Sequence, residues 1–155
     1  MSRASSSSSG PPDHGSAGTP DLFVYGTLAL DDVVRTLIDR VPASEHTSAP
    51  GWRAARLPDL PYPGLVRDSK AEAPGRVYTD LTDTEWNVLD AFEDPTYSVE
   101  VVRLRSARAS LAYIWPDEAL PDAWSTSSFV GDEMQAYLER CARWRARFES
   151  RTQSG

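Results

Sequence analysis

The apolar residues of this chain group into short runs and stripes whose spacing alternates between that of strands and that of helices. A β-prone run at 22–25 ends at Gly26, and apolar residues at helical spacing then continue up to Pro42. This pattern predicts a strand, a tight turn and a helix, and Asp31 is the expected N-cap of that helix.

The middle of the chain is less regular. We expect a loop over 42–50 and a weak strand over 51–57. The segment 58–64 contains three prolines, so neither a central strand nor a helix is expected there. A further strand is predicted to begin at 75–78.

A helix with clear end signals follows. Thr82 and Glu85 have the spacing of a capping box, and Leu81 and Trp86 occupy the two positions of a hydrophobic staple. Pro95 is expected to stop this helix.

The last third predicts a hairpin and a long helix. Residues 97–104 alternate as a strand does, and 111–115 is the expected partner strand. Apolar residues between Met134 and Phe148 form a helical stripe, and we interpret the nearby arginines as a solvated face. The order β-α-β-β-α-β-β-α predicts an α+β domain with a mixed sheet.

Composition adds a boundary near the start of the chain. The segment 2–20 is rich in Ser, Gly and Pro and contains no large apolar residue, which predicts disorder. The chain has 155 residues, of which 40% are hydrophobic and 25% charged, as in ordinary globular proteins. We therefore expect a tail over 1–20 and one folded domain over 21–150.

Charge and cysteine content restrict the partners. The net charge of -7 argues against a nucleic-acid or membrane-surface partner. No run approaches the roughly 20 apolar residues that a membrane-spanning helix needs. Cys141 is the only cysteine, which excludes an intrachain disulfide and favours a cytoplasmic location, with the thiol buried in the core. We expect a monomer or a homodimer.

Several kinds of active site lack the residues they need. The only histidines are His14, in the tail, and His46, in a polar segment. Neither is well placed to be the base of a Ser-His-Asp or Cys-His system. Metal-ligand motifs, a P-loop and GxGxxG are all missing, and we predict neither a metal nor a cofactor. The chemistry must come from carboxylates, hydroxyls and backbone N–H groups.

Three segments offer such groups. The turn Tyr25, Gly26, Thr27, Leu28 would expose backbone N–H groups able to bind a carboxylate or an oxyanion, although a plain strand-helix turn is the alternative. Gly26 would let a ligand approach the main chain closely.

Glu93 is the second candidate, at the end of the capped helix and next to Phe92. The helix dipole and the apolar neighbour both disfavour its charged form, which would raise its pKa into the range useful for proton transfer. An exposed glutamate at a helix end is the alternative. Asp90 is a weaker candidate for the same role.

Tyr62 is the third candidate, because the prolines on either side would hold its phenol in place. A stiff loop with a packed aromatic is the alternative. Other aromatic residues of the second half could line a pocket or belong to the core: Tyr97, Tyr113, Trp115 and Trp124.

These segments together resemble the γ-glutamylcyclotransferase-like superfamily, and especially its AIG2-like branch. The matching stretches are Phe23-Val-Tyr-Gly-Thr-Leu28, Tyr62-Pro-Gly64, Gly75-Arg-Val-Tyr78, Leu89-Asp-Ala-Phe-Glu93, Tyr97 and Ala112-Tyr-Ile-Trp115. The resemblance implies a compact, barrel-like mixed sheet flanked by helices.

The resemblance also implies a reaction, in which the α-amine of a γ-glutamyl group attacks its own γ-amide carbonyl and 5-oxoproline and an amine result. It implies that Glu93 is the acid/base, that residues 25–28 hold the glutamyl end, and that Tyr62 and Tyr97 contact the substrate. The partner would be a γ-glutamyl small molecule.

Two departures from the family pattern concern the site. Asp94-Pro95 follows the glutamate where members often have Gly, and Val99 stands where an Arg often lies. These departures leave the identity of the leaving amine open. The alternatives are a catalytically silent module on the same fold, which binds a metabolite or a protein, and a different amidohydrolase or amine-transfer activity.

Overall fold

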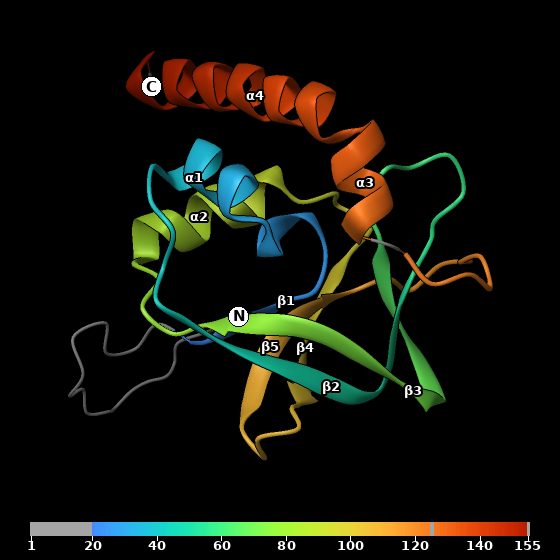
Figure 1. Ribbon diagram of the computed structural model, residues 1–155. Coiled ribbons are helices and arrows are strands. Elements are labelled where there is room, and N and C mark those ends of the chain that lie inside the picture. Colours follow the sequence, from blue (N-terminus) through green and yellow to red (C-terminus); the bar gives the residue numbers. More distant parts are fainter. Residues whose placement is uncertain (1–19, 125, 155) are drawn as a thin grey trace, which may run out of the picture.

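The computed structural model describes residues 20–124 and 126–154, so the tail expected over 1–20 lies outside it except for Pro20. Strands and helices follow one another in the predicted order, with one helix added before the last (Figure 1). Their bounds are β1 Leu22–Val24, the 3-10 helix η2 Thr27–Ala29, α1 Asp31–Ile38, β2 Ser44–Ala55, β3 Gly64–Tyr78, α2 Asp83–Phe92, β4 Ser98–Arg103, β5 Ala109–Ile114, α3 Thr126–Asp132 and α4 Met134–Ser154. The α+β class is confirmed.

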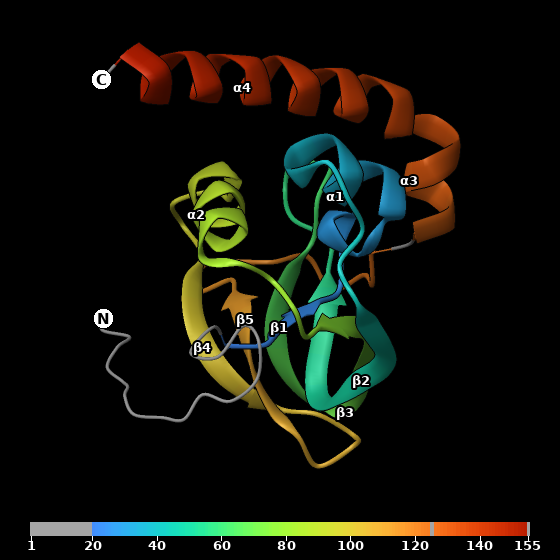
Figure 2. The ribbon, with the colours of Figure 1, turned by 90° about the vertical axis from the view of Figure 1, so that its left-hand side faces the viewer.

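The five strands form one mixed sheet in the order β2-β3-β1-β5-β4. β1 runs parallel to β5, whereas β1–β3, β2–β3 and β4–β5 are antiparallel. Because β1 is short, the long strand β3 pairs with β1 at its end and reaches β5 near its start, where Leu65 pairs with Ile114. The sheet therefore curls around β1, with the helices gathered on one side (Figure 2).

The short strand β1 is buried on both faces. Leu22 and Val24 point into the core beneath the helices, and Phe23 points into a second core within the curled strands. This alternation is the period of two expected of a strand, and it makes β1 the centre of the domain. The site segment that follows β1 is therefore attached to one of the most buried parts of the chain.

The loop predicted over 42–50 is wrong, because β2 begins at Ser44. The strand predicted to begin at 75–78 also starts earlier, at Gly64. These two strands extend as a hairpin at the edge of the sheet, where a solvated face accepts the polar residues that suggested a loop. The register shifts between Pro50 and Trp52, and Gly51 adopts φ 85°, so the proline lies at a bulge of an edge strand, where it is tolerated.

Of the two helix starts with a predicted cap, that of α2 is as expected and that of α1 is not. The capping box of α2 is confirmed: the Thr82 hydroxyl accepts the Glu85 N–H, and the Glu85 carboxylate accepts the Thr82 N–H. Asp31 is not the N-cap of α1. Leu30 takes that position without a side-chain bond, and Asp31, the first helical residue, forms an ion pair with Arg76 at 2.7 Å.

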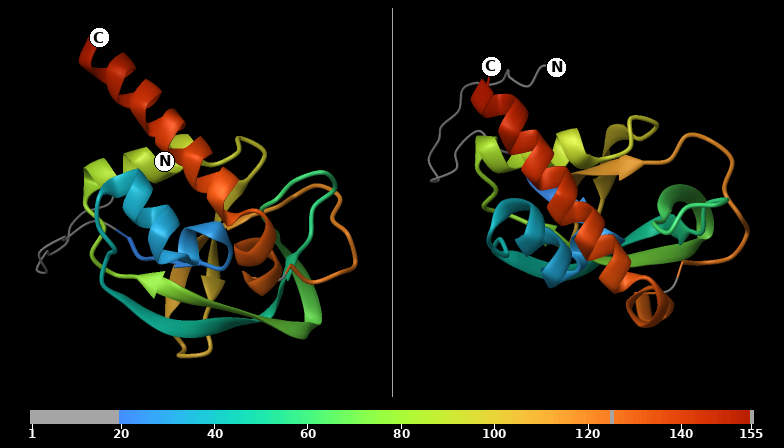
Figure 3. Two further views of the ribbon diagram at one scale, coloured as in Figure 1. Left: turned by 45° about the horizontal axis from the view of Figure 1, so that its top comes forward. Right: turned by 90° about the horizontal axis from the view of Figure 1, so that it is seen from above.

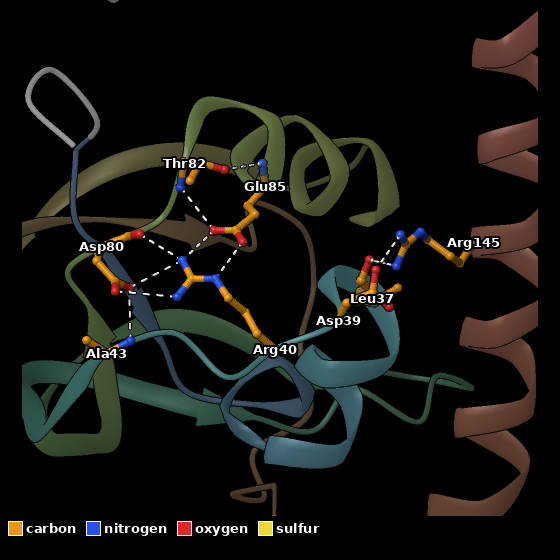
Figure 4. Close-up of polar contacts among 8 residues, drawn as sticks. All are labelled: Leu37, Asp39, Arg40, Ala43, Asp80, Thr82, Glu85 and Arg145. Carbon is orange, nitrogen blue, oxygen red and sulfur yellow. Dashed lines mark hydrogen bonds and ion pairs between the residues drawn. The ribbon is translucent and has the colours of Figure 1, made fainter. Parts of the chain in front are cut away.

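Arg40 joins the segment after α1 to the start of α2 (Figure 4). Its Nε and Nη2 atoms each donate to the Glu85 carboxylate at 2.6 Å, and Nη2 also donates to the Asp80 carbonyl oxygen at 2.8 Å. The Arg40 guanidinium lowers the pKa of Glu85, whose side chain is only 14% exposed. Arg40 thus fixes the helix that ends at Glu93.

Arg145 attaches α4 to the end of α1 (Figure 4). It donates to the carbonyl oxygen of Leu37 at 2.7 Å and to the carboxylate of Asp39 at 2.8 Å. The last carbonyls of a helix attract a cation, which explains this docking. The arginines of α4 therefore do not all belong to a solvated face, although Cys141 on the same helix is buried as predicted.

We expect Arg40→Met to lower the free energy of unfolding by about 1–3 kcal/mol, because Glu85 would keep its largely buried charge without its partner. Urea denaturation monitored by circular dichroism measures this loss. Arg35→Met is the matched control: its ion pair with Asp32 is more than half exposed on both sides, and its removal should cost under about 0.5 kcal/mol. Equal effects of the two variants would contradict the structural role of Arg40.

Candidate active site

The seven residues predicted for the site lie around one cavity, although they come from four separate segments. The cavity is narrow, with a volume of about 20 Å³ in which the centre of a water molecule fits. Its lining consists of Phe23, Val24, Tyr25, Gly26, Thr27, Leu28, Tyr62, Pro63, Glu93, Tyr97 and Tyr113. The structure thus brings all seven together and adds four neighbours, of which Tyr113 was a candidate for pocket or core.

Gly26 is required by a neighbouring side chain. A Cβ atom at this position would lie 2.5 Å from Cγ of Pro63, and the backbone has φ −131°, outside the left-handed region. That this glycine also lets a ligand approach the main chain stays a prediction, and the structure adds a packing reason for the glycine. Its missing side chain is what lets the loop that carries Tyr62 pack against the turn after β1.

The turn after β1 is a 3-10 turn whose first N–H groups are not used within the turn itself. The N–H of Ala29 donates to the Gly26 carbonyl and that of Leu30 to the Thr27 carbonyl, which is the pattern of a 3-10 turn. The N–H groups at the start of such a turn have no partner within it. The Thr27 hydroxyl is held by a 3.2 Å hydrogen bond to the Tyr137 hydroxyl of α4.

Two tyrosines of the cavity bind the backbone of neighbouring segments. The Tyr25 hydroxyl donates to the Tyr113 carbonyl oxygen at 2.6 Å and accepts the Leu65 N–H at 3.2 Å. The Tyr97 hydroxyl donates to the Pro63 carbonyl oxygen at 2.5 Å. These bonds connect β1, β3, β4, β5 and the 56–63 loop, so the hydroxyls fix the walls of the cavity.

Two other tyrosines bind the carboxylates on either side of Glu93. The Tyr62 hydroxyl donates to Asp94 at 2.7 Å, and the Tyr113 hydroxyl donates to Asp90 at 2.9 Å. Asp94 also accepts the N–H of Thr96 at 2.8 Å. Burial raises the pKa of Tyr62 to about 12, with the Asp94 carboxylate adding to the effect, so this phenol remains a neutral donor near pH 7.

Glu93 is the residue that ends α2, and its backbone N–H still bonds to the Leu89 carbonyl at 3.1 Å. Burial raises the pKa of its carboxyl group to about 8, and the charges of Asp94 and Asp90 act in the same direction. The residue as a whole is partly exposed, whereas its carboxyl group is closely surrounded by protein. Within the described part of the chain, no arginine or lysine forms an ion pair with it.

The chemical consequence is a carboxyl group that can exchange a proton near neutral pH. A carboxyl with a pKa near 8 is mostly protonated at pH 7, and about a tenth of it is ionised. Such a group can accept a proton in one step and return it in the next.

A second cavity adjoins the first and shares Tyr62 and Glu93 with it. It is wider, with a volume of about 240 Å³ on the same measure, and its lining consists of Tyr62, Ala91, Phe92, Glu93, Asp94, Pro95, Tyr137 and Arg140. The sequence did not indicate Tyr137 or Arg140, because one fits a buried stripe and the other a solvated face. Their position depends on how α4 docks, for which the local pattern gives no signal.

Two searches concern other kinds of site. Across residues 20–124 and 126–154, no three His, Cys, Asp or Glu side chains gather as metal ligands would. Among the helices described, none has the length and apolar character needed to cross a membrane.

Comparison with known proteins identifies relatives over most of the chain. The family model described as "Gamma-glutamyl cyclotransferase, AIG2-like" matches residues 22–131. AIG2-like protein D of Arabidopsis thaliana is 34% identical over 114 residues, which cover 70% of this chain and 75% of that protein. AIG2-like protein C of the same plant is also 34% identical, covering 70% of this chain and 66% of its own length. A solution structure of an Arabidopsis thaliana protein superposes with a TM-score of 0.60 at 27% identity, covering 78% and 87% of the two chains.

We expect Glu93→Gln to stabilise the fold increasingly as the pH rises. The native pKa of Glu93 is raised, so its neutral form supports folding below about pH 4.5, and this support is lost as the pH passes through about 8. Each unit of difference between folded and unfolded pKa corresponds to about 1.4 kcal/mol, so the variant should gain more than about 1 kcal/mol over the parent between pH 5 and pH 9. Urea denaturation at a series of pH values measures the gain.

Glu45→Gln, which removes an exposed carboxyl from β2, is the matched control for the loss of one negative charge. A constant difference in stability between parent and Glu93→Gln across this pH range would contradict the raised pKa.

Proposed function

The chain belongs to the AIG2-like gamma-glutamyl cyclotransferase family, and we propose that it cyclises the γ-glutamyl group of a γ-glutamyl amide to 5-oxoproline with Glu93 as acid/base. The observation that carries this proposal is the Glu93 carboxyl, with its pKa near 8, on the wall of the cavity that the turn after β1 also lines. We place the reaction in the cytoplasm and assign it no metal or cofactor.

The reaction suits these residues because the substrate supplies its own nucleophile. The α-amine nitrogen forms a bond to the γ-carbonyl carbon, and the amide bond from that carbon to the leaving nitrogen breaks. Ionised Glu93 accepts one proton from the α-ammonium, which frees the amine to attack, and the resulting acid returns this proton to the leaving nitrogen. The attacking nitrogen loses a second proton as the ring closes, and the same carboxylate transfers it, so that the amine departs as its ammonium form. No serine, cysteine or histidine nucleophile is needed.

Besides proton transfer, the geometry in which the substrate is bound contributes to the rate enhancement. Ring closure requires the α-amine to lie against the γ-carbonyl, and a cavity with fixed walls holds a bent substrate in that conformation. The N–H groups of Thr27 and Leu28, which have no partner within their turn, are suited to a carboxylate or to the oxyanion that develops on the carbonyl. We assign the glutamyl end of the substrate to this turn, beside Tyr62 and Tyr97.

The two departures from the family pattern are compatible with this function. Asp94 accepts hydrogen bonds from Tyr62 and Thr96 and raises the pKa of Glu93, so it supports the proposed acid/base. Val99 lines neither cavity, and 43% of its surface is exposed on β4.

A panel of γ-glutamyl amides and peptides, assayed for 5-oxoproline by mass spectrometry without added metal or nucleotide, tests the proposal. We expect at least one substrate. Glu93→Gln should lower kcat by at least about 100-fold with a smaller change in KM, because it removes proton transfer and keeps the shape. Asp90→Asn should lose less, since Asp90 lines neither cavity and holds Tyr113.

Two results would overturn this account. If folded protein forms no 5-oxoproline from any substrate of the panel, the catalytically silent binding module is favoured. Near-parental kcat for Glu93→Gln at saturating substrate would remove Glu93 from the acid/base role.

The pH profile gives an independent prediction. Because Glu93 must lose a proton before it can act as the base, kcat/KM should rise with pH through an apparent pKa near 8. Asp94→Asn removes the charge that raises this pKa most after burial, so the rise should move to lower pH. Asp122→Asn, an exposed position, should leave the profile in place. An unchanged profile in Asp94→Asn would contradict the assignment.

A further inference from the structure

The second cavity lies between the end of α2 and the helix α4. Figure 3 shows α4 running diagonally over the layer that contains α1 and α2, and the first half of α4 contributes to the lining of this cavity. Tyr137 and Arg140 of α4 form one wall, and residues 91–95 form the other. Neither Tyr137 nor Arg140 lies within residues 22–131, which match the family model.

Arg140 is an exposed residue of this wall, and its charge, after the hydrogen bonds from Thr96 and Tyr62, is among the causes that lower the pKa of Asp94. Its guanidinium carbon lies 5.9 Å from the ring centre of Tyr62 and 5.6 Å from that of Tyr137. Within the described residues it makes neither an ion pair nor a hydrogen bond, whereas Arg145 on the same helix bonds to Leu37, Asp39 and Glu149. These two cation–π contacts keep the guanidinium beside the rings and leave its N–H donors for a ligand.

Of the described residues that line either cavity, Arg140 is the only cation. The second cavity also contains the carboxyl groups of Asp94 and Glu93, and neither is a fully charged group with free bonding capacity. Asp94 already accepts bonds from Tyr62 and Thr96, and the raised pKa of Glu93 keeps much of that carboxyl neutral at pH 7. The group in the cavity with unused bonding capacity and full charge is therefore positive, and it suits a carboxylate.

We propose that the second cavity binds the leaving side of the substrate and that Arg140 selects leaving amines that carry a carboxylate. This inference rests on the proposed cyclisation. The bond that breaks must lie beside Glu93, which belongs to both cavities, so a glutamyl group in the first cavity directs the leaving nitrogen and its substituent into the second. The substrate class is then a γ-glutamyl amide with an anionic substituent on the amide nitrogen.

Two matched probes test this selection: γ-L-glutamyl-L-alanine and its C-terminal carboxamide differ only in the charge on the leaving side. We expect kcat/KM for the carboxylate probe to exceed that for the carboxamide by about tenfold or more. Arg140→Gln should reduce this ratio to near one, and Arg140→Lys should keep part of it. Calorimetric binding of both probes to Glu93→Gln protein should show the same preference without turnover.

Arg143→Gln is the matched control, because Arg143 is an exposed arginine of the same helix that lines neither cavity. Its ratio should equal that of the parent. Thermal melting of each variant establishes that the comparison is made on folded protein.

The outcomes separate this inference from the proposed function. Equal turnover of both probes, or a parental ratio in Arg140→Gln, overturns the role of Arg140 and leaves the cyclisation intact. Preferential binding of the carboxylate probe that depends on Arg140, without 5-oxoproline from any substrate, supports the binding site and overturns the cyclisation. Preference for a γ-glutamyl diamine such as γ-glutamyl-putrescine over both probes would mean that Asp94, and not Arg140, binds the charged end of the leaving amine. This result would overturn the proposal.

Discussion

Keeping the Glu93 carboxyl in closely packed, aromatic surroundings is the constraint on which the rest of the structure depends. An ionised carboxylate loses hydration when it is buried, so it needs either a cationic partner or neighbours that tolerate its neutral form. Here the lining tyrosines remain protonated, and the nearest charges, Asp94 and Asp90, are themselves negative. A carboxyl placed in this way exchanges its proton near neutral pH, which is the property that the proposed reaction uses.

Such a site needs walls that do not move to relieve the unfavourable charge. The lining hydroxyls supply this rigidity by bonding across segments: Tyr25 to the backbone of β5 and β3, Tyr97 to the loop at Pro63, and Tyr62 to Asp94. Packing of Pro63 against Gly26 joins the two loops directly. Farther out, Arg40 fixes the start of α2, and Arg145 fixes α4 against α1. The helix α4 then adds Tyr137 and Arg140, through which this chain acquires a wall that the matched family region does not include.

The sequence predicted those parts of the fold and site that local spacing controls. The capping box at Thr82 set the start of α2, and Pro95 its end, so Glu93 could be assigned to a helix terminus. The sequence predicted only the second part of β2 and the end of β3, because an edge strand with one solvated face has the polar composition of a loop. Pro50 fits in β2 because the strand bulges there. The place of Arg140 was not predictable from its helix, because it depends on contacts such as Arg145 with Leu37, which are 108 residues apart.

The ionisation of Glu93 tests the central claim most directly. Glutamate labelled with ¹³C at the side-chain carboxyl carbon gives a resonance for each glutamate, and the signal of Glu93 is the one absent from Glu93→Gln protein. Titration of the folded parent should move this signal with a midpoint near pH 8. A midpoint near pH 4.5 would mean that the carboxyl behaves as an ordinary exposed glutamate, and it would contradict the account of this site.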